Sequence, residues 1–233
     1  MKKKKAILFV IILPMLVCIL APLIYFSFIS VSAKTGLTVV IDAGHGGKDN
    51  GVSGIISKTP EADLNLEYAF TLKKKMEEQG YRVIMTRTTK EILYSNLNIT
   101  NKQKDMRRRM EIIANSGAEL MISIHMNFYS ARSVRGAQVF YNSSNSGAKE
   151  LAKAIQKTLN ENVNILYAKR NVVHLAGDYY ILKQTPLPAV IVECGFLSNV
   201  EDEKLLLDKD YKELLCANIA LGASAFLAVR GEA

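Results

Sequence analysis

Two apolar runs, each followed closely by a histidine, constrain the fold of this chain most. The runs cover residues 39–42 and 120–124, and the histidines are His45 and His125. Both runs are short and rich in β-branched residues, which is typical of buried strands in a parallel sheet. Open α/β sheets carry their functional groups just beyond the carboxyl ends of such strands. The runs therefore predict an α/β fold with His45 and His125 at one edge of its sheet.

The rest of the chain alternates predicted strands with predicted helices. Strands are expected at residues 37–42, 81–86, 119–124, 136–141 and 189–193, with a short one at 172–175, and helices at 60–79, 102–115, 146–162 and 211–229. Thr59 is expected to cap the first helix, with Pro60 as its first residue. This alternation predicts a single α/β domain over residues 34–233, in which a mostly parallel mixed sheet has helices on both faces.

An apolar stretch precedes this domain. Residues 6–31 carry no charge and follow the basic segment Lys2–Lys5, so the stretch is long enough to cross a bilayer with its basic flank inside. The segment 31–33, Val-Ser-Ala, fits a signal peptidase site. We therefore expect residues 1–33 to be a signal peptide or a membrane anchor. Either one exports the domain, and an uncleaved leader keeps the N-terminus in contact with the membrane.

Charge and cysteine content exclude some classes of protein. The net charge is +8, of which Lys2–Lys5 contribute four, leaving +4 for the exported part. A modest positive charge suits an anionic polymer such as the cell wall. Basic and aromatic residues are not interleaved and no nucleic-acid module is recognisable, so we expect no nucleic-acid partner. Cys194 and Cys216 fall in apolar segments and are predicted to be free, buried thiols.

Two glutamates complete a candidate metal site. Catalytic zinc takes three protein ligands, and neutral imidazole is the commonest of them. Glu61 opens a predicted helix, where the helix dipole favours the ionised carboxylate that a metal needs. Glu193 ends a very apolar predicted strand, an expensive place for a carboxylate without a partner or a cavity. The sequence thus predicts His45, Glu61 and His125 as metal ligands and Glu193 as a general base.

Each of these residues also has a purely structural reading. A single histidine at a strand end is more often a hydrogen-bonded structural residue, Glu61 alone is an ordinary first-turn charge, and Glu193 alone can be a buried ion-pair partner. His174 has no supporting partner and is read as structural. The glycine-rich turn at 44–47 lacks the last glycine of a dinucleotide-binding motif, and no GK[ST] follows it. The metal reading rests on the four residues together.

Four stretches of this sequence together resemble one protein family. They are residues 41–47, Glu61 with residues 63–66, residues 123–127 and residues 188–199. In content, order and spacing they resemble the zinc-dependent N-acetylmuramoyl-L-alanine amidases of the amidase-3 family over about residues 37–229. The short layout, a leader followed by a catalytic domain, resembles the germination-specific branch that helps to form muramic δ-lactam in spore cortex.

The resemblance implies an activity, a metal and a set of site residues. It implies that Zn²⁺ is held by His45, Glu61 and His125, with Glu193 catalytic in hydrolysis of the amide between N-acetylmuramic acid and L-alanine of peptidoglycan. Substrate contacts are expected at Arg109, Asn127 and Lys183, and the neighbouring Arg107 and Arg108 leave the register of the family's arginine open. Lysine in place of the family's arginine at 183 would weaken a bidentate contact to a carboxylate. Without a wall-binding module, the domain is expected to need a protein partner for placement or activation.

Three other functions remain open at this stage. One is a zinc hydrolase that cuts another cell-wall bond, and the second is a catalytically silent wall-binding or regulatory domain. A membrane-anchored structural protein would explain the leader but none of the four motifs. A divalent ion other than zinc would also suit a set of histidine and carboxylate ligands.

Overall fold

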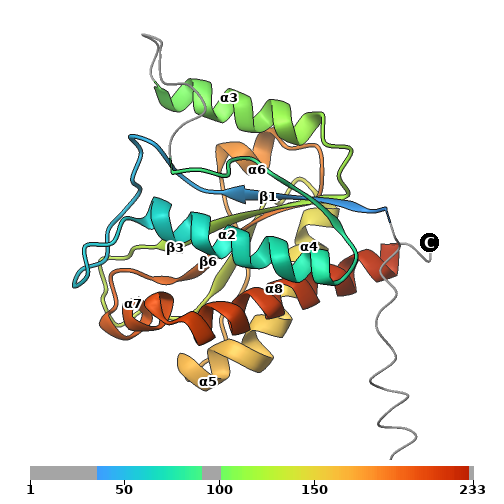
Figure 1. Cartoon of the computed structure of the whole chain (residues 1–233). Helices are drawn as coiled ribbons and strands as arrows, with labels where there is room; N and C mark the ends of the chain where they lie inside the picture. The colour runs from blue at the N-terminus through green and yellow to red at the C-terminus, as the bar shows by residue number, and fades with distance from the viewer. Residues whose placement is uncertain (1–35, 91–100, 231–233) are drawn as a thin grey trace, which may run out of the picture.

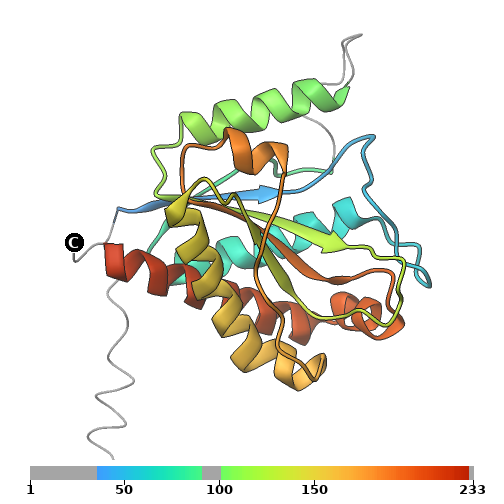
Figure 2. The same ribbon diagram turned by 180° about the vertical axis from the view of Figure 1, so that it is seen from behind.

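The computed structural model describes residues 36–90 and 101–230, which form one α/β unit (Figures 1 and 2). The predicted signal peptide or anchor at residues 1–33 lies outside the described residues. The sheet has six strands in the order β2-β1-β3-β6-β4-β5. Their bounds are β1 Thr38–Ala43, β2 Arg82–Met85, β3 Leu120–Asn127, β4 Gln138–Tyr141, β5 Leu175–Ala176 and β6 Ala189–Phe196.

The sheet is mixed, as predicted. Strand β1 pairs in parallel with β2 and β3, and β3 pairs in parallel with β6. Strand β4 runs antiparallel to β6, and the short β5 is parallel to β4. The carboxyl ends of β1, β3 and β6 therefore meet at one edge of the sheet, which we call the carboxyl edge.

Helices cover both faces of the sheet. They are α2 Glu61–Glu78, α3 Asn101–Ala114, α4 Ser146–Leu159, the π-helical turn η1 Asn160–Asn164, α5 Ile165–Tyr167, α6 Tyr180–Gln184, α7 Val200–Leu207 and α8 Lys209–Arg230. Helices α3 and α6 lie on one face, and α2, α4 and α8 lie on the other (Figures 1 and 2). This arrangement confirms the predicted layers.

The alternation of side chains along the strands produces the two apolar cores. In β1, Val39 and Ile41 belong to the larger core under α2, α4 and α8, whereas Val40 belongs to the smaller core with Ile113 of α3 and Ile181 of α6. Successive side chains of a strand point to opposite faces, so one buried strand supplies both cores. This is why the predicted strands read as continuous apolar runs.

Several local expectations need correction. Pro60 has an extended backbone and is itself the N-cap of α2, which begins at Glu61, so Thr59 is not the cap. The helix expected at 146–162 is α-helical only to Leu159 and continues as the π-helical turn. The short strand expected at 172–175 lies instead at Leu175–Ala176. Helices α5, α6 and α7 are not anticipated by the sequence reading.

Helix α8 is a core element. Among the described residues it is the one helix long and apolar enough to span a membrane, but 56% of its apolar window is buried inside the protein. It packs against α2 and α4. Cys216 of α8 and Cys194 of β6 are free and buried, as predicted.

Candidate active site

The turn after β1 presents His45 at the carboxyl edge. His45 has a φ of 58°, a left-handed conformation that non-glycine residues adopt rarely. Gly44 precedes it, and a Cβ atom at Gly44 would collide with the ring of His125. The glycine thus allows the turn to approach β3 closely, so that the His45 and His125 rings meet edge to face with centroids 5.1 Å apart.

Glu61 joins the two histidines from the first turn of α2. Its Oε1 lies 3.0 Å from Nδ1 of His125 and 3.2 Å from Nε2 of His45. The ligand atoms of all three residues lie within 4.8 Å of one another. Residues 45, 61 and 125, far apart in sequence, therefore converge on one point at the carboxyl edge, as the sequence predicts.

The charges of this group favour ionised Glu61. Burial alone would raise the pKa of Glu61, but hydrogen bonds and positive charge from His125 and His45 hold it well below its ordinary value. Burial likewise lowers the pKa of His45, and the carboxylates of Glu61 and Asp49 more than offset this and raise it. An ionised carboxylate between two imidazoles is the state in which such a group binds a cation.

Neighbouring groups orient the ligands. Nδ1 of His45 lies 2.9 Å from Oδ1 of Asp49, which leaves Nε2 facing Glu61. The amide of Asn65 donates to Oε1 of Glu61 at 3.2 Å, and the backbone N–H of Val52 donates to Oε2 at 3.0 Å. Such outer contacts fix the tautomer and orientation of metal ligands.

The donor set and its surroundings fit a divalent cation such as zinc. Two imidazoles and one carboxylate are the ligand types that catalytic zinc takes. Gly51 leaves room beside the carboxylate, because a Cβ atom there would collide with Oε2 of Glu61. The side chain of Glu61 is 4% exposed and that of His45 is 22% exposed. Burial of charged groups costs free energy unless their charges are balanced by a partner, and a bound cation would balance the carboxylate.

Glu193 stands beside this group on the adjacent strand. It is paired in register with His125 across β3 and β6 and is 8% exposed. Its Oε2 is buried without a hydrogen-bond partner among the described residues. Burial raises the pKa of Glu193 to about 7, an effect that the charge of His125 opposes and that of Glu61 reinforces. A buried carboxyl that titrates near neutral pH can take up and release a proton.

The guanidinium of Arg109 is occupied by partners within the chain. It is 3% exposed, and its guanidinium pairs with Asp42 at 2.6 Å and with Asp105 at 2.7 Å. It also donates to the backbone carbonyls of Ala43 and His45. All of these partners lie within the chain, so the geometry supports a role in holding the His45 turn.

Arg87 has a similar position and is absent from the sequence prediction. It is 4% exposed and donates to the carbonyls of Ala43, Gly44 and Ala62 at 2.8 to 2.9 Å. It thereby ties the turn that carries His45 to the first turn of α2, which carries Glu61. The sequence does offer one signal for Arg87, because it directly follows the predicted strand at 81–86. An arginine that is buried at such a place needs several hydrogen-bond acceptors around its guanidinium.

The two other predicted substrate residues differ in position. Asn127 is the last residue of β3, two residues beyond His125, and its side chain accepts a hydrogen bond from the N–H of Phe128. Lys183 lies in the last turn of α6, pairs with Asp178 and lines a surface depression with Asn142. Asn142 follows the end of the antiparallel strand β4, so this depression faces away from the carboxyl edge. Asn127 thus lies at the same edge of the sheet as the metal group, and Lys183 does not.

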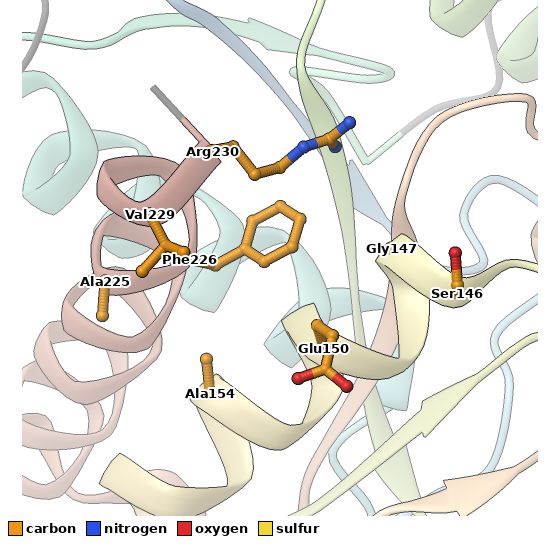
Figure 3. A pocket seen from close by; sticks show the side chains of 8 residues that line it. All are labelled: Ser146, Gly147, Glu150, Ala154, Ala225, Phe226, Val229 and Arg230. Atoms are coloured by element: carbon orange, nitrogen blue, oxygen red, sulfur yellow. The ribbon is translucent and has the colours of Figure 1, made fainter. Parts of the chain in front are cut away.

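A further cavity lies away from this edge. It has a volume of about 550 Å³ between the start of α4 and the end of α8, where Ala154, Phe226 and Val229 form much of its wall (Figure 3). Glu150 and Arg230 are its charged lining residues, and neither His45 nor His125 is among the residues that line it. This cavity therefore contains none of the predicted site residues.

A mixed α/β sheet with a His-Glu-His group and a buried carboxyl at its carboxyl edge defines a candidate metal-dependent hydrolase. The model of the N-acetylmuramoyl-L-alanine amidase family Amidase_3 matches residues 39–225, and the chain belongs to this family. The chain is 33% identical over 205 residues to the germination-specific N-acetylmuramoyl-L-alanine amidase of Bacillus subtilis (strain 168), covering 85% of this chain and 83% of the relative.

Solved structures agree in fold. The CwlD amidase of Clostridioides difficile, in complex with the GerS lipoprotein, matches with a TM-score of 0.78 and 36% identity, covering 83% of this chain and all of that one. An N-acetylmuramoyl-L-alanine amidase of Clostridium difficile 630 matches with a TM-score of 0.73 and 29% identity over 85% of this chain and all of that one. The family expected from the four motifs is thus confirmed.

Proposed function

We propose that this chain hydrolyses the amide between N-acetylmuramic acid and L-alanine in peptidoglycan, with zinc held by His45, Glu61 and His125. The observation that carries the proposal is the convergence of these three ligand groups beside the buried carboxyl of Glu193. Membership of the amidase family supplies the bond that is cut. The three residues provide the coordination, and the partial exposure of the His45 and His125 side chains leaves the group accessible to water and the substrate carbonyl.

Zinc bound at this site would act as a Lewis acid that polarises the carbonyl and makes water a better nucleophile. Glu193 is then the proton carrier: it takes a proton from the attacking water and delivers it to the amine nitrogen as the amide bond breaks. A pKa of about 7 suits both steps, since the carboxylate and the acid are both populated near neutral pH. A purely binding domain has no use for such a group.

Asn127 is the substrate contact that the geometry favours among the three expected ones. It ends β3 two residues after His125. We propose that Arg109 acts through the His45 turn, because its donors already bind Asp42 and two backbone carbonyls. A contact from Lys183 would require substrate that extends away from the carboxyl edge.

Product analysis tests this function. Purified peptidoglycan digested by the zinc-loaded protein should release stem peptides that begin with free L-alanine, without new reducing sugar ends or shortened peptides. Removal of zinc by a chelator should stop the release, and zinc addition should restore it. Shortened peptides or deacetylated sugars would instead favour the rival zinc hydrolases, and absence of any product would favour a silent wall-binding domain.

The biological setting is proposed by analogy with the named relatives. One is described as germination-specific, and we propose that this chain acts on spore cortex, in the formation of muramic lactam. This requires export, which the apolar leader at residues 1–33 supports, with the domain in the cell envelope. Cortex from a strain that lacks this protein should contain no muramic lactam, and cortex with normal lactam content would contradict the assignment.

A protein partner is proposed on similar grounds. The CwlD amidase was solved with a lipoprotein bound to it. We propose that a membrane-associated protein likewise positions or activates this chain. Co-purification from envelope extracts and a rise in turnover on adding the purified partner would support this, whereas full activity of the isolated protein on cortex peptidoglycan would count against it.

A further inference from the structure

A groove at the carboxyl edge has a cationic lining. It has a volume of about 410 Å³ and is lined by Lys102, Gln103, Met106 and Arg107 of α3 and by Tyr180 of α6. No acidic residue is among these lining residues of the described part of the chain. The charged part of the groove is thus positive, and Met106 and Tyr180 supply an apolar surface beside it.

The topology places this groove beside the metal ligands. Helix α3 leads back into β3, and α6 leads back into β6, and both strands are parallel. The first turns of both helices therefore lie at the carboxyl edge, where β3 delivers His125 and β6 delivers Glu193. Both helices lie on the same face of the sheet (Figure 1).

Direct contacts connect the groove to the site. Nζ of Lys102 lies 3.3 Å from Oδ2 of Asp49, whose other oxygen lies 2.9 Å from Nδ1 of His45. On the opposite side, Tyr179 adjoins the lining residue Tyr180, and burial with the nearby charge of Glu193 raises the pKa of Tyr179. One wall of the groove thus contacts Asp49, the partner of His45, and the residue that precedes Tyr180 in the other wall lies within range of the charge of Glu193.

The charge of the groove selects a ligand class. Arg107 has no carboxylate within ion-pair distance among the described residues, so its guanidinium is available to a ligand. Sugar hydroxyls are neutral, whereas a stem peptide carries carboxylates, and arginine binds carboxylates through paired N–H donors. We propose that this groove binds a carboxylate-bearing part of the stem peptide and so helps to orient the scissile amide. The inference rests on the proposed amidase function.

Arg107→Gln is the test variant, because Arg107 has no contact with Asp49 or the metal ligands. Arg108→Gln is the matched control, since Arg108 lies on the same helix, pairs with Glu111 and does not line the groove. The assay uses zinc-loaded protein and soluble N-acetylmuramoyl peptides in two forms, with free carboxylates or with those groups amidated. Zinc content and melting temperature confirm that both variants are folded.

We expect the parent protein to show a KM about three- to tenfold lower for the carboxylate form, a modest ratio because the groove is exposed. Arg107→Gln should lose this preference with little change in kcat, and Arg108→Gln should keep it. Unchanged preference in Arg107→Gln, or equal loss in both variants, would overturn the proposal.

A binding measurement separates this inference from the proposed activity. Calorimetric titration with the free stem peptide, in carboxylate and amidated forms, needs no turnover. Stronger binding of the carboxylate form that disappears in Arg107→Gln would support the groove even if the protein cut no amide. Equal binding of both forms by the parent protein would refute the groove while leaving the amidase function untouched.

Discussion

At the residue scale, two buried arginines hold the turn that presents His45. Arg87 and Arg109 together bind the carbonyls of Ala43, Gly44 and His45, and Arg87 also binds that of Ala62. Burial of a guanidinium is costly unless its donors find acceptors. The positive φ of His45 is thus supported by fixed donors on its neighbouring carbonyls, and the imidazole is held before any metal binds.

Replacement of Arg87 by lysine tests this support. A single ammonium group cannot reach the same set of carbonyls, so we expect the free energy of unfolding to fall by about 3 kcal/mol and zinc affinity to fall about tenfold. Urea unfolding and competition with a zinc indicator measure the two effects. Arg82→Lys, at an exposed position of β2, is the control. Equal zinc affinity in both variants would show that Arg87 does not position the site.

Asp42 predicts a pH dependence of stability. Burial alone would raise its pKa, but the charge of Arg109 and hydrogen bonds from Ser123 and Thr86 lower it to about 2. A carboxyl with a depressed folded pKa stabilises the protein above its unfolded pKa, about 4, and loses this contribution as the pH falls to about 2. The contribution is roughly 2 kcal/mol.

Asp42→Asn lacks this titration. The difference in unfolding free energy between the parent protein and Asp42→Asn should therefore be constant above about pH 5 and should shrink between about pH 4 and pH 2. Chemical unfolding at a series of pH values measures it. A difference that grows as the pH falls would contradict the assigned ion pair with Arg109.

At the scale of elements, α7 fixes the loop that leads into α2. Glu203 of α7 is 1% exposed and accepts hydrogen bonds from the N–H groups of Ile56 at 3.0 Å and Ser57 at 2.7 Å. The N–H of Val52, further back in the same loop, donates to Glu61. A short helix near the end of the chain thus stabilises the approach to a metal ligand near its beginning.

Glu203→Gln should weaken this loop. The amide has one acceptor oxygen where the carboxylate has two, so we expect a loss of about 1–2 kcal/mol in unfolding free energy and faster proteolytic cleavage within residues 51–60. Glu201→Gln, at an exposed position of the same helix, should change neither. Denaturant unfolding and limited proteolysis test this, and identical cleavage rates in the two variants would contradict it.

The elements that were predictable from sequence are those buried on both faces. Strands β1, β3 and β6 read as apolar runs because both cores draw on them. Helix α7 carries a recognisable start, since the side chain of Asn199 accepts from the N–H groups of Glu201 and Asp202, but its eight residues give too little periodicity for detection. The π-helical turn is unpredictable locally, because Asn160 and Asn164 are held there by distant partners.

At the scale of the whole molecule, the parallel strands determine where the chemistry lies. Side chains from β1, β3 and β6 reach the carboxyl edge together, which is why His45, His125 and Glu193 could be predicted as one site. Glu61 alone is weaker evidence, since an acidic first turn is common in helices, and it was predicted as a ligand only in combination with the two histidines and Glu193. The contacts of Arg87 and Arg109 depend on tertiary packing. Sequence reasoning consequently missed Arg87, and it could not foresee that Arg109 binds Asp42 and two backbone carbonyls.

Zinc content and turnover, measured on the same samples, test the central claim most directly. The parent protein and Glu193→Ala should each bind one zinc ion per chain, because Glu193 is outside the ligand group, while Glu193→Ala loses turnover by a factor of about 10² to 10⁴. His125→Ala should lose both zinc and activity. Full turnover in Glu193→Ala, or undiminished zinc binding in His125→Ala, would contradict a metal centre built from His45, Glu61 and His125 with Glu193 as its base.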